Sequence, residues 1–221
     1  MKFQATIFDM DGLLIDSEIH WGVVEDDIWG KLGMEPSEAL NREILGLNMT
    51  DTCIVIHKYR PDISVEKIRA VFNAGAQIVY KLAEFMPGAS ELLSALKQEA
   101  GTKIALVSSS SQSWVNQFLD KFNLQHFFDL VLSTEGMSIP GKPAPDAYIE
   151  SMKRLGVAPT QSIIFEDTTR GLTAAKGSGA FTVAVPDPRW SFGDFSSADL
   201  VVSSLRDKKV YEALGLEFSP K

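Results

Sequence analysis

The chain has 221 residues, of which 45% are hydrophobic and 23% charged, and this ordinary globular composition excludes a disordered or low-complexity protein. Its net charge of −8 argues against general nucleic-acid binding, and no apolar run approaches the roughly 18 residues that a membrane span needs. With one cysteine (Cys53), no possible internal disulfide and no signal-peptide pattern at the start, we expect a soluble, cytoplasmic, monomeric protein without nucleic-acid or membrane partners.

Short apolar runs alternate with helical patterns along most of the chain. The runs are rich in Val, Ile and Phe, as buried strands are, and cover residues 5–8, 104–107, 130–132, 163–165, 182–185 and 200–202. Between the later runs, apolar residues recur at helical spacing, as at Val115, Phe118, Leu119 and Phe122. The pattern predicts an α/β fold with a Rossmann-like, doubly wound parallel sheet and helices on both faces.

The alternation is interrupted between the first and second apolar runs. Residues from about 17 to 85 have helical periodicity, with Pro36 and Pro61 as interruptions. We therefore predict a catalytic core formed by residues 1–15 and 87–221 and an inserted all-helical cap domain formed by residues 16–86. Residues 187–197, rich in Asp, Ser, Phe and Pro, are predicted to form a surface loop.

Polar side chains follow three of the predicted strands at the point where each strand ends. They are Asp9 and Asp11 after the first strand, Ser108 and Ser109 after the second, and Glu166 and Asp167 after the fourth. In open α/β sheets, ligands bind outside the carboxyl ends of the strands, where the strand order reverses. These side chains would converge there if the first strand lies centrally in the sheet.

Convergence would place four carboxylates, from Asp9, Asp11, Glu166 and Asp167, in one site. Carboxylates at such distances repel one another unless a cation or protons compensate their charge. A ligand set made only of oxygen, without His or Cys, suits Mg²⁺ better than Zn²⁺. Because Mg²⁺ in proteins often bridges to a phosphate, the predicted metal also indicates a phosphorylated ligand.

The same residues fit the roles that phosphoryl transfer requires. Asp9 can act as a nucleophile that forms an aspartyl-phosphate, and Asp11, two residues on, can protonate the leaving alcohol and then activate water. Ser108, with backbone amides around Ser109, can donate hydrogen bonds to the phosphate oxygens, and Lys142 can supply positive charge. Each motif alone is weak evidence, but their order along the chain makes the set specific.

These motifs resemble those of the haloacid-dehalogenase (HAD) superfamily along nearly the whole chain. The matching positions are Asp9 to Gly12, Ser108, Lys142 and the pair Glu166-Asp167. Residues 13–18 resemble the subgroup of β-phosphoglucomutase and the sugar-phosphate phosphatases. The resemblance implies that Asp9 is the nucleophile and Asp11 the acid/base. It also implies that the Asp9 side chain, the Asp11 main-chain carbonyl and Asp167, assisted by Glu166, hold Mg²⁺ under a helical cap that sets specificity.

Three positions help to choose among activities in this family. Asp11 disfavours dehalogenation, because haloacid dehalogenases resemble this chain but lack that second Asp. Trp21 and Met49 stand where β-phosphoglucomutase carries a His and an Arg, and Trp21 is instead a candidate for substrate contact. We expect a Mg²⁺-dependent phosphatase of a small phosphorylated metabolite, with a sugar phosphate favoured. The alternatives are a phosphosugar isomerase, a nucleotide-type phosphatase such as one acting on pseudouridine 5′-phosphate, and a non-catalytic binding module.

Overall fold

The computed structural model describes residues 2–44, 47–99, 101–135 and 137–218. Its centre is a six-stranded parallel sheet with the strand order β3-β2-β1-β4-β5-β6. The strands are β1 (Ala5–Phe8), β2 (Lys103–Ser108), β3 (Leu130–Ser133), β4 (Ser162–Glu166), β5 (Phe181–Ala184) and β6 (Leu200–Val201). The predicted strands are therefore confirmed, with ends that differ by no more than one residue.

Strand β1 lies between β2 and β4, so the strand order reverses beside it. Phe8 pairs with Leu106 on one side and with Phe165 on the other. This register brings the carboxyl ends of the three strands to one edge of the sheet. The central position of the first strand, which the convergence of the polar side chains requires, is thus confirmed.

Helices cover both faces of the sheet, as the alternation predicts. Helices α5 (Ala89–Gln98), α6 (Gln112–Lys121) and α9 (Lys208–Leu214) cover one face, and α7 (Asp146–Leu155) and α8 (Thr169–Gly177) cover the other. Successive residues of a strand point to opposite faces, so Phe8 packs in the core beneath the first group and Ile7 in the core beneath the second. The apolar side chains of β1 are thereby buried on both sides.

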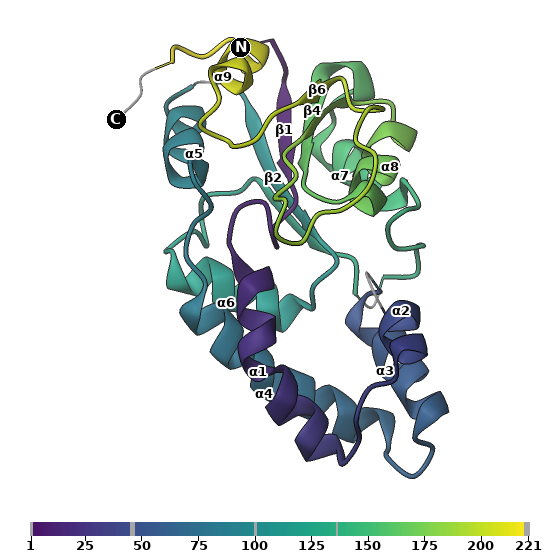
Figure 1. The fold of residues 1–221 in the computed structure, drawn as a ribbon. Helices are drawn as coiled ribbons and strands as arrows, with labels where there is room; N and C mark the ends of the chain where they lie inside the picture. The colour runs from purple at the N-terminus through teal and green to yellow at the C-terminus, as the bar shows by residue number, and fades with distance from the viewer. Residues whose placement is uncertain (1, 45–46, 100, 136, 219–221) are drawn as a thin grey trace.

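In the described residues between β1 and α5, four helices are inserted, and they lie at the opposite end of the molecule from α9 (Figure 1). They are α1 (Ser17–Leu32), α2 (Glu38–Ile44), α3 (Met49–Tyr59) and α4 (Val65–Leu82). We call α1–α4 the cap. The predicted helical content of this stretch is confirmed, while the division of the chain after residues 15 and 86 stays a proposal.

Local sequence explains where the cap helices begin and which face they bury. The side chains of Asn48 and Ser64 cap α3 and α4 by accepting hydrogen bonds from backbone N–H groups of the first turn. Helix α4 buries Ile68 and Val79 against its neighbours, but Leu82, at the last residue of the helix, is exposed.

Each helix in the described part of the chain is too short or too polar to span a lipid bilayer.

Candidate active site

A cavity of about 690 Å³ lies between the carboxyl edge of the sheet and the cap. The residues predicted for the site that line it are Asp9, Asp11, Trp21, Ser108, Ser109, Lys142 and Asp167. Glu166 is the exception, because it is buried behind the cavity wall with its carboxylate against Lys142. The structure therefore brings together, at one edge of the sheet, side chains separated by up to 158 positions in the chain.

Lys142 lies between two carboxylates at the floor of the cavity. Its Nζ is 2.5 Å from Asp9 Oδ1 and 2.6 Å from Glu166 Oε1. Arg170 donates a hydrogen bond of 2.5 Å to the main-chain oxygen of Lys142, which fixes the loop that carries the lysine. Burial opposes the positive charge, yet Asp9 and Glu166 raise the pKa of Lys142 well above its ordinary value. The lysine is therefore a permanent cation that positions Asp9.

The positive charge of Lys142 does not balance the acidic groups around it. Burial raises the pKa of Asp9 to about 8, although Lys142 opposes the shift, and Glu166 and Asp11 add to it. Burial, followed by repulsion from Asp9 and Glu166, also raises the pKa of Asp167 well above its ordinary value. A further cation beside these carboxylates would relieve both the burial penalty and the repulsion.

Three buried carboxylates are placed to hold such a cation. Ligand oxygens of Asp9, Glu166 and Asp167 lie within 4.8 Å of one another. Within the described part of the chain, Glu166 Oε2 and Asp167 Oδ1 are buried without any hydrogen-bond partner. Unpaired buried carboxylate oxygens are costly, and oxygen ligands suit a hard divalent ion such as Mg²⁺. The residues present therefore fit the metal that the sequence predicts.

Two glycines leave room for these carboxylates. A Cβ atom on Gly171 would lie 2.0 Å from the Glu166 carboxyl group, and one on Gly12 would lie 2.3 Å from Asp167 Oδ2. Gly12 also has a φ of 78°, which turns the chain away from β1 in a conformation that side chains disfavour. At both positions a side chain would displace a carboxylate of the candidate metal site.

The Asp11 carboxylate is held by three hydroxyl donors and does not belong to the cluster of three buried carboxylates described above. Oδ1 accepts hydrogen bonds from Ser17 (2.7 Å) and Tyr80 (2.8 Å), and Oδ2 accepts one from Ser110 (2.6 Å). Tyr80 belongs to α4, and its burial and the nearby Asp11 charge raise its pKa well above the ordinary value, so it stays a donor. Part of the environment of Asp11 therefore comes from the cap, which no spacing in the sequence indicates.

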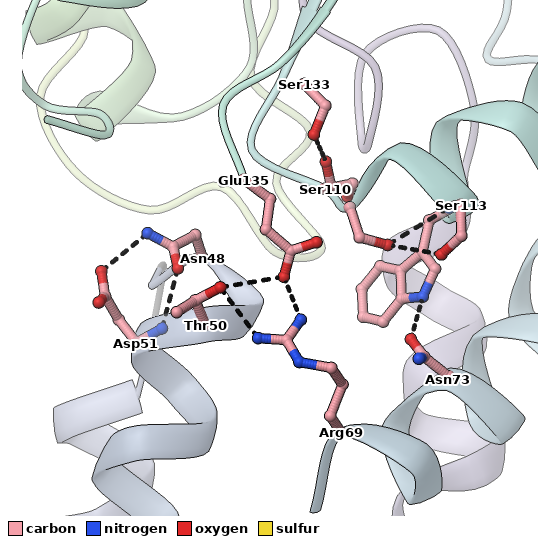
Figure 2. Close-up of polar contacts among 11 residues, drawn as sticks. Asn48, Thr50, Asp51, Arg69, Asn73, Ser110, Ser113, Ser133 and Glu135 are labelled. Carbon is pink, nitrogen blue, oxygen red and sulfur yellow. Dashed lines mark hydrogen bonds and ion pairs between the residues drawn. The ribbon is translucent and has the colours of Figure 1, made fainter. Parts of the chain in front are cut away.

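The serines after β2 shape the wall of the cavity next to Asp9. The buried Ser108 hydroxyl accepts a hydrogen bond of 3.0 Å from the Ser110 backbone N–H. Ser133, at the end of β3, donates a hydrogen bond of 2.7 Å to the Ser110 carbonyl (Figure 2). These bonds hold the turn that places Ser109 at the cavity surface.

Polar contacts also connect the cap with the core (Figure 2). Glu135, in the loop after β3, forms an ion pair with Arg69 of α4 and accepts a hydrogen bond of 3.2 Å from Thr50 of α3. Arg69 donates a second bond, of 2.9 Å, to Thr50. Trp114 Nε1 of α6 donates to Asn73 Oδ1 of α4 at 2.8 Å. These contacts fix the cap over the catalytic edge of the sheet.

The segment 187–197, predicted to be a surface loop, has no regular secondary structure but reaches the site. Trp190 and Ser191 line the cavity, and the Ser191 hydroxyl donates to Asp167 Oδ2 at 3.3 Å. Ser191 is buried, whereas Phe192 beside it is 75% exposed. The prediction of a surface loop is therefore confirmed for most of the segment, whereas loop composition does not reveal that Trp190 and Ser191 reach the cavity.

Known proteins resemble this chain over almost its full length. It is 31% identical to "Hexitol phosphatase B" of Escherichia coli (strain K12), over 96% of each chain. It is 32% identical to "Probable pseudouridine-5'-phosphatase" of Drosophila melanogaster, over 94% of this chain and 92% of the relative. The phosphatase names of these relatives agree with the prediction of a phosphoric monoester hydrolase.

Solved structures share the fold. CbbY from Rhodobacter sphaeroides, in complex with phosphate, matches with a TM-score of 0.77 and 24% identity, over 92% of this chain and 95% of that one. The β-phosphoglucomutase of Clostridium difficile matches with a TM-score of 0.74 and 22% identity, over 96% of both chains. The family model described as "Haloacid dehalogenase-like hydrolase" matches residues 6–185. The chain thus belongs to the haloacid dehalogenase-like hydrolase family.

Proposed function

We propose that this protein is a Mg²⁺-dependent phosphatase that hydrolyses a small phosphorylated metabolite, a sugar or polyol phosphate, through an aspartyl-phosphate on Asp9. The observation that carries the proposal is the buried Asp9 carboxylate. It forms an ion pair with Lys142 and lies beside two carboxylates, each with an oxygen that has no hydrogen-bond partner. The relative named for hexitol phosphatase supports a polyol phosphate, and the relative named for pseudouridine-5'-phosphatase supports the wider class of small phosphorylated metabolites.

Asp9, Glu166 and Asp167 would hold the Mg²⁺ ion, with the main-chain carbonyl of Asp11 as a further oxygen ligand. When bound, the ion supplies positive charge that attracts a phosphate and offsets the charge of the carboxylates around it. Ser108 and the amides around Ser109 would donate to the phosphate oxygens from the other side of the cavity.

Asp9 and Asp11 would carry out the two chemical steps. The first step starts with Asp11 protonated. An Asp9 carboxylate oxygen forms a bond to phosphorus, the P–O bond to the alcohol breaks, and Asp11 gives its proton to the leaving oxygen, which makes Asp11 a carboxylate. In the second, Asp11 takes a proton from a water molecule as that water attacks phosphorus, the bond to Asp9 breaks, and inorganic phosphate leaves. Asp9 and Asp11 then return to their starting protonation states.

The direct test is a panel of sugar, polyol and nucleotide phosphates assayed for phosphate release, with Mg²⁺ and with a chelator. The proposal expects release from at least one sugar or polyol phosphate, loss of that release with the chelator, and recovery when Mg²⁺ is added back. Conversion of β-glucose 1-phosphate to glucose 6-phosphate with little phosphate release would show an isomerase instead. Absence of turnover with every compound would favour a binding module.

Tyr80 offers a test of the role of Asp11. Tyr80→Phe keeps the buried ring but removes the hydroxyl that donates to Asp11. Because a hydrogen bond to a charged group contributes about 1.5–3 kcal/mol, we expect kcat to fall by about tenfold or more. KM should stay nearly constant, since the hydroxyl contacts Asp11 and not the expected position of the phosphate.

Steady-state kinetics of Tyr80→Phe and of a control, Tyr59→Phe, measure this effect. Tyr59 is an exposed cap tyrosine whose hydroxyl also donates to a carboxylate, that of Glu43. The control should retain the kcat of the unmodified protein. An unchanged kcat in Tyr80→Phe would contradict the positioning of Asp11 by the cap.

The contacts of Glu135 give a second test of the cap. Glu135→Gln removes the charge that holds Arg69 while keeping the shape of the side chain. We expect kcat/KM to fall by about fivefold, the equivalent of about 1 kcal/mol, because a less firmly docked cap encloses the substrate less well. Glu150→Gln, which breaks an exposed ion pair within α7, is the matched control and should leave kcat/KM unchanged. Equal values of kcat/KM for the two variants would show that the Glu135–Arg69 ion pair does not hold the cap in place.

A further inference from the structure

The cap half of the cavity is walled by aromatic rings. The ring of Trp21 lies 5.2 Å from that of Trp114 and 6.5 Å from that of Phe72, measured between centroids. Trp29 meets Phe72 edge-on, with 6.0 Å between centroids. All four side chains line the cavity, and they form an apolar wall to which Trp21, Trp29 and Phe72 of the cap and Trp114 of α6 contribute. Such a wall packs well against the C–H groups of an uncharged alcohol.

The ionisable groups on this side of the cavity are acidic. Among the described cap residues that line it, only Glu18 and Glu25 are ionisable. Glu25 is exposed and accepts a hydrogen bond of 3.2 Å from Trp29 Nε1, which holds its carboxylate at the wall. Whether charged or protonated, neither glutamate can supply positive charge to a ligand.

The cations that line the cavity among the described residues, Lys142 and Arg170, both belong to the core. Lys142 is paired with Asp9 and Glu166, whereas Arg170 donates to the main chain of Lys142 and forms no ion pair with a described carboxylate. On the cap, Arg69 is paired with Glu135. A phosphate ester that carried a second anionic group toward the cap would therefore place that group on an aromatic wall beside two acids, where no described lining residue of the cap is a cation.

We propose that this half of the cavity selects monophosphate esters of uncharged alcohols and rejects esters with a second anionic group, with Glu25 and Glu18 as specificity-determining residues. This inference rests on the proposed phosphatase function and narrows its substrate class. Its physical basis is that an anion transferred from water to this wall loses hydration, gains no ion pair and meets like charge.

Two pairs of compounds isolate the effect of the second charge. Sorbitol 6-phosphate and 6-phosphogluconate differ only in a hydroxymethyl or a carboxylate group at the end remote from the phosphate. Glycerol 3-phosphate and 3-phosphoglycerate differ in the same way on a shorter chain. Each compound is tested as a substrate, and as a competitive inhibitor of the best substrate in the panel. We expect kcat/KM, or affinity as an inhibitor, to be at least about tenfold higher for the member of each pair that lacks the carboxylate.

Glu25→Lys tests the assignment to a residue, because it places a cation where the acid stands. It should raise the use of 6-phosphogluconate relative to sorbitol 6-phosphate by about tenfold. Asp26→Lys, at the next position of α1, makes the same change of charge on an exposed side chain that does not line the cavity, and it should leave the ratio unchanged.

The outcomes separate this inference from the proposed function. If no phosphate ester of the panel is hydrolysed, the proposed function fails and the inference fails with it. If phosphate is released but the two members of each pair perform equally, including equal failure to bind, only the inference is overturned. A ratio that shifts as much in Asp26→Lys as in Glu25→Lys would overturn the assignment to Glu25.

Discussion

Asp9→Asn is expected to reduce phosphate release by about 10⁴-fold or more, the scale of loss seen when an enzyme loses its nucleophile. The amide has nearly the shape of the carboxylate but cannot form the acyl phosphate. Lys142 keeps its second partner, Glu166, 2.6 Å away, so that the floor of the cavity stays paired. The replacement also removes one of three crowded buried carboxylates. We therefore expect the fold to be retained and the midpoint of thermal unfolding not to fall by more than a few degrees.

Phosphate-release assays and thermal unfolding, carried out on the same preparation, check both parts of this prediction. Asp26→Asn is the matched control, because it makes the same chemical change on an exposed residue of α1 outside the cavity. It should keep full activity. Hydrolysis by Asp9→Asn at a rate near that of the unmodified protein would refute Asp9 as the nucleophile.

Lys142→Ala is expected to lower both stability and activity. The variant leaves Asp9 and Glu166 buried without the cation that lies within 2.6 Å of both. Removing one partner of a buried ion pair costs about 3–5 kcal/mol, because the other charge stays buried without compensation. Activity should be lost even where the protein is folded, since Asp9 then lacks the cation that positions it for attack.

Chemical unfolding, monitored with and without Mg²⁺, measures the loss of stability. Lys153→Ala is the control, because Lys153 pairs with Glu150 on the surface, where its own side chain is 78% exposed. Its free energy of unfolding should change by less than about 1 kcal/mol. A similarly small change for Lys142→Ala would mean that the buried carboxylates are neutral and do not need the lysine.

Much of this site follows from the sequence because the polar side chains occur directly after apolar runs. Short runs of three or four residues rich in Val, Ile and Phe mark buried strands, and parallel strands place their carboxyl ends at one edge. The positions of Asp9, Ser108 and Asp167 are therefore consequences of strand order. Gly12 was likewise predictable as a turn, and its φ of 78° confirms it.

The surroundings of these residues were not predictable from the sequence. Tyr80 reaches Asp11 across 69 positions of the chain, and Arg69 reaches Glu135 across 66. Such contacts depend on how the cap docks on the core, which periodicity within a helix does not specify. Gly171 was missed for a related reason, because only the position of the Glu166 carboxylate shows that a side chain there would collide.

Aromatic residues around the cavity illustrate the same limit. Trp21 was a candidate for substrate contact, and it lines the cavity as expected. Trp29 and Trp114 have the burial of core residues, at 7% and 6% exposure, yet they line the cavity as well. A tryptophan at a helical core position can thus belong to a binding wall, and the distinction depends on the volume left beside it rather than on the pattern of the helix.

The central claim, that Asp9 carries the phosphoryl group, is tested most directly by trapping it. The protein is mixed with Mg²⁺ and a substrate from the panel, turnover is stopped with acid within the first cycle, and the phosphorylated peptide is located by mass spectrometry. We predict an acid-stable, hydroxylamine-sensitive phosphoryl group on Asp9, and none in Asp9→Asn. Rapid turnover with no phosphorylated peptide, or with the phosphoryl group on another residue, would contradict the account.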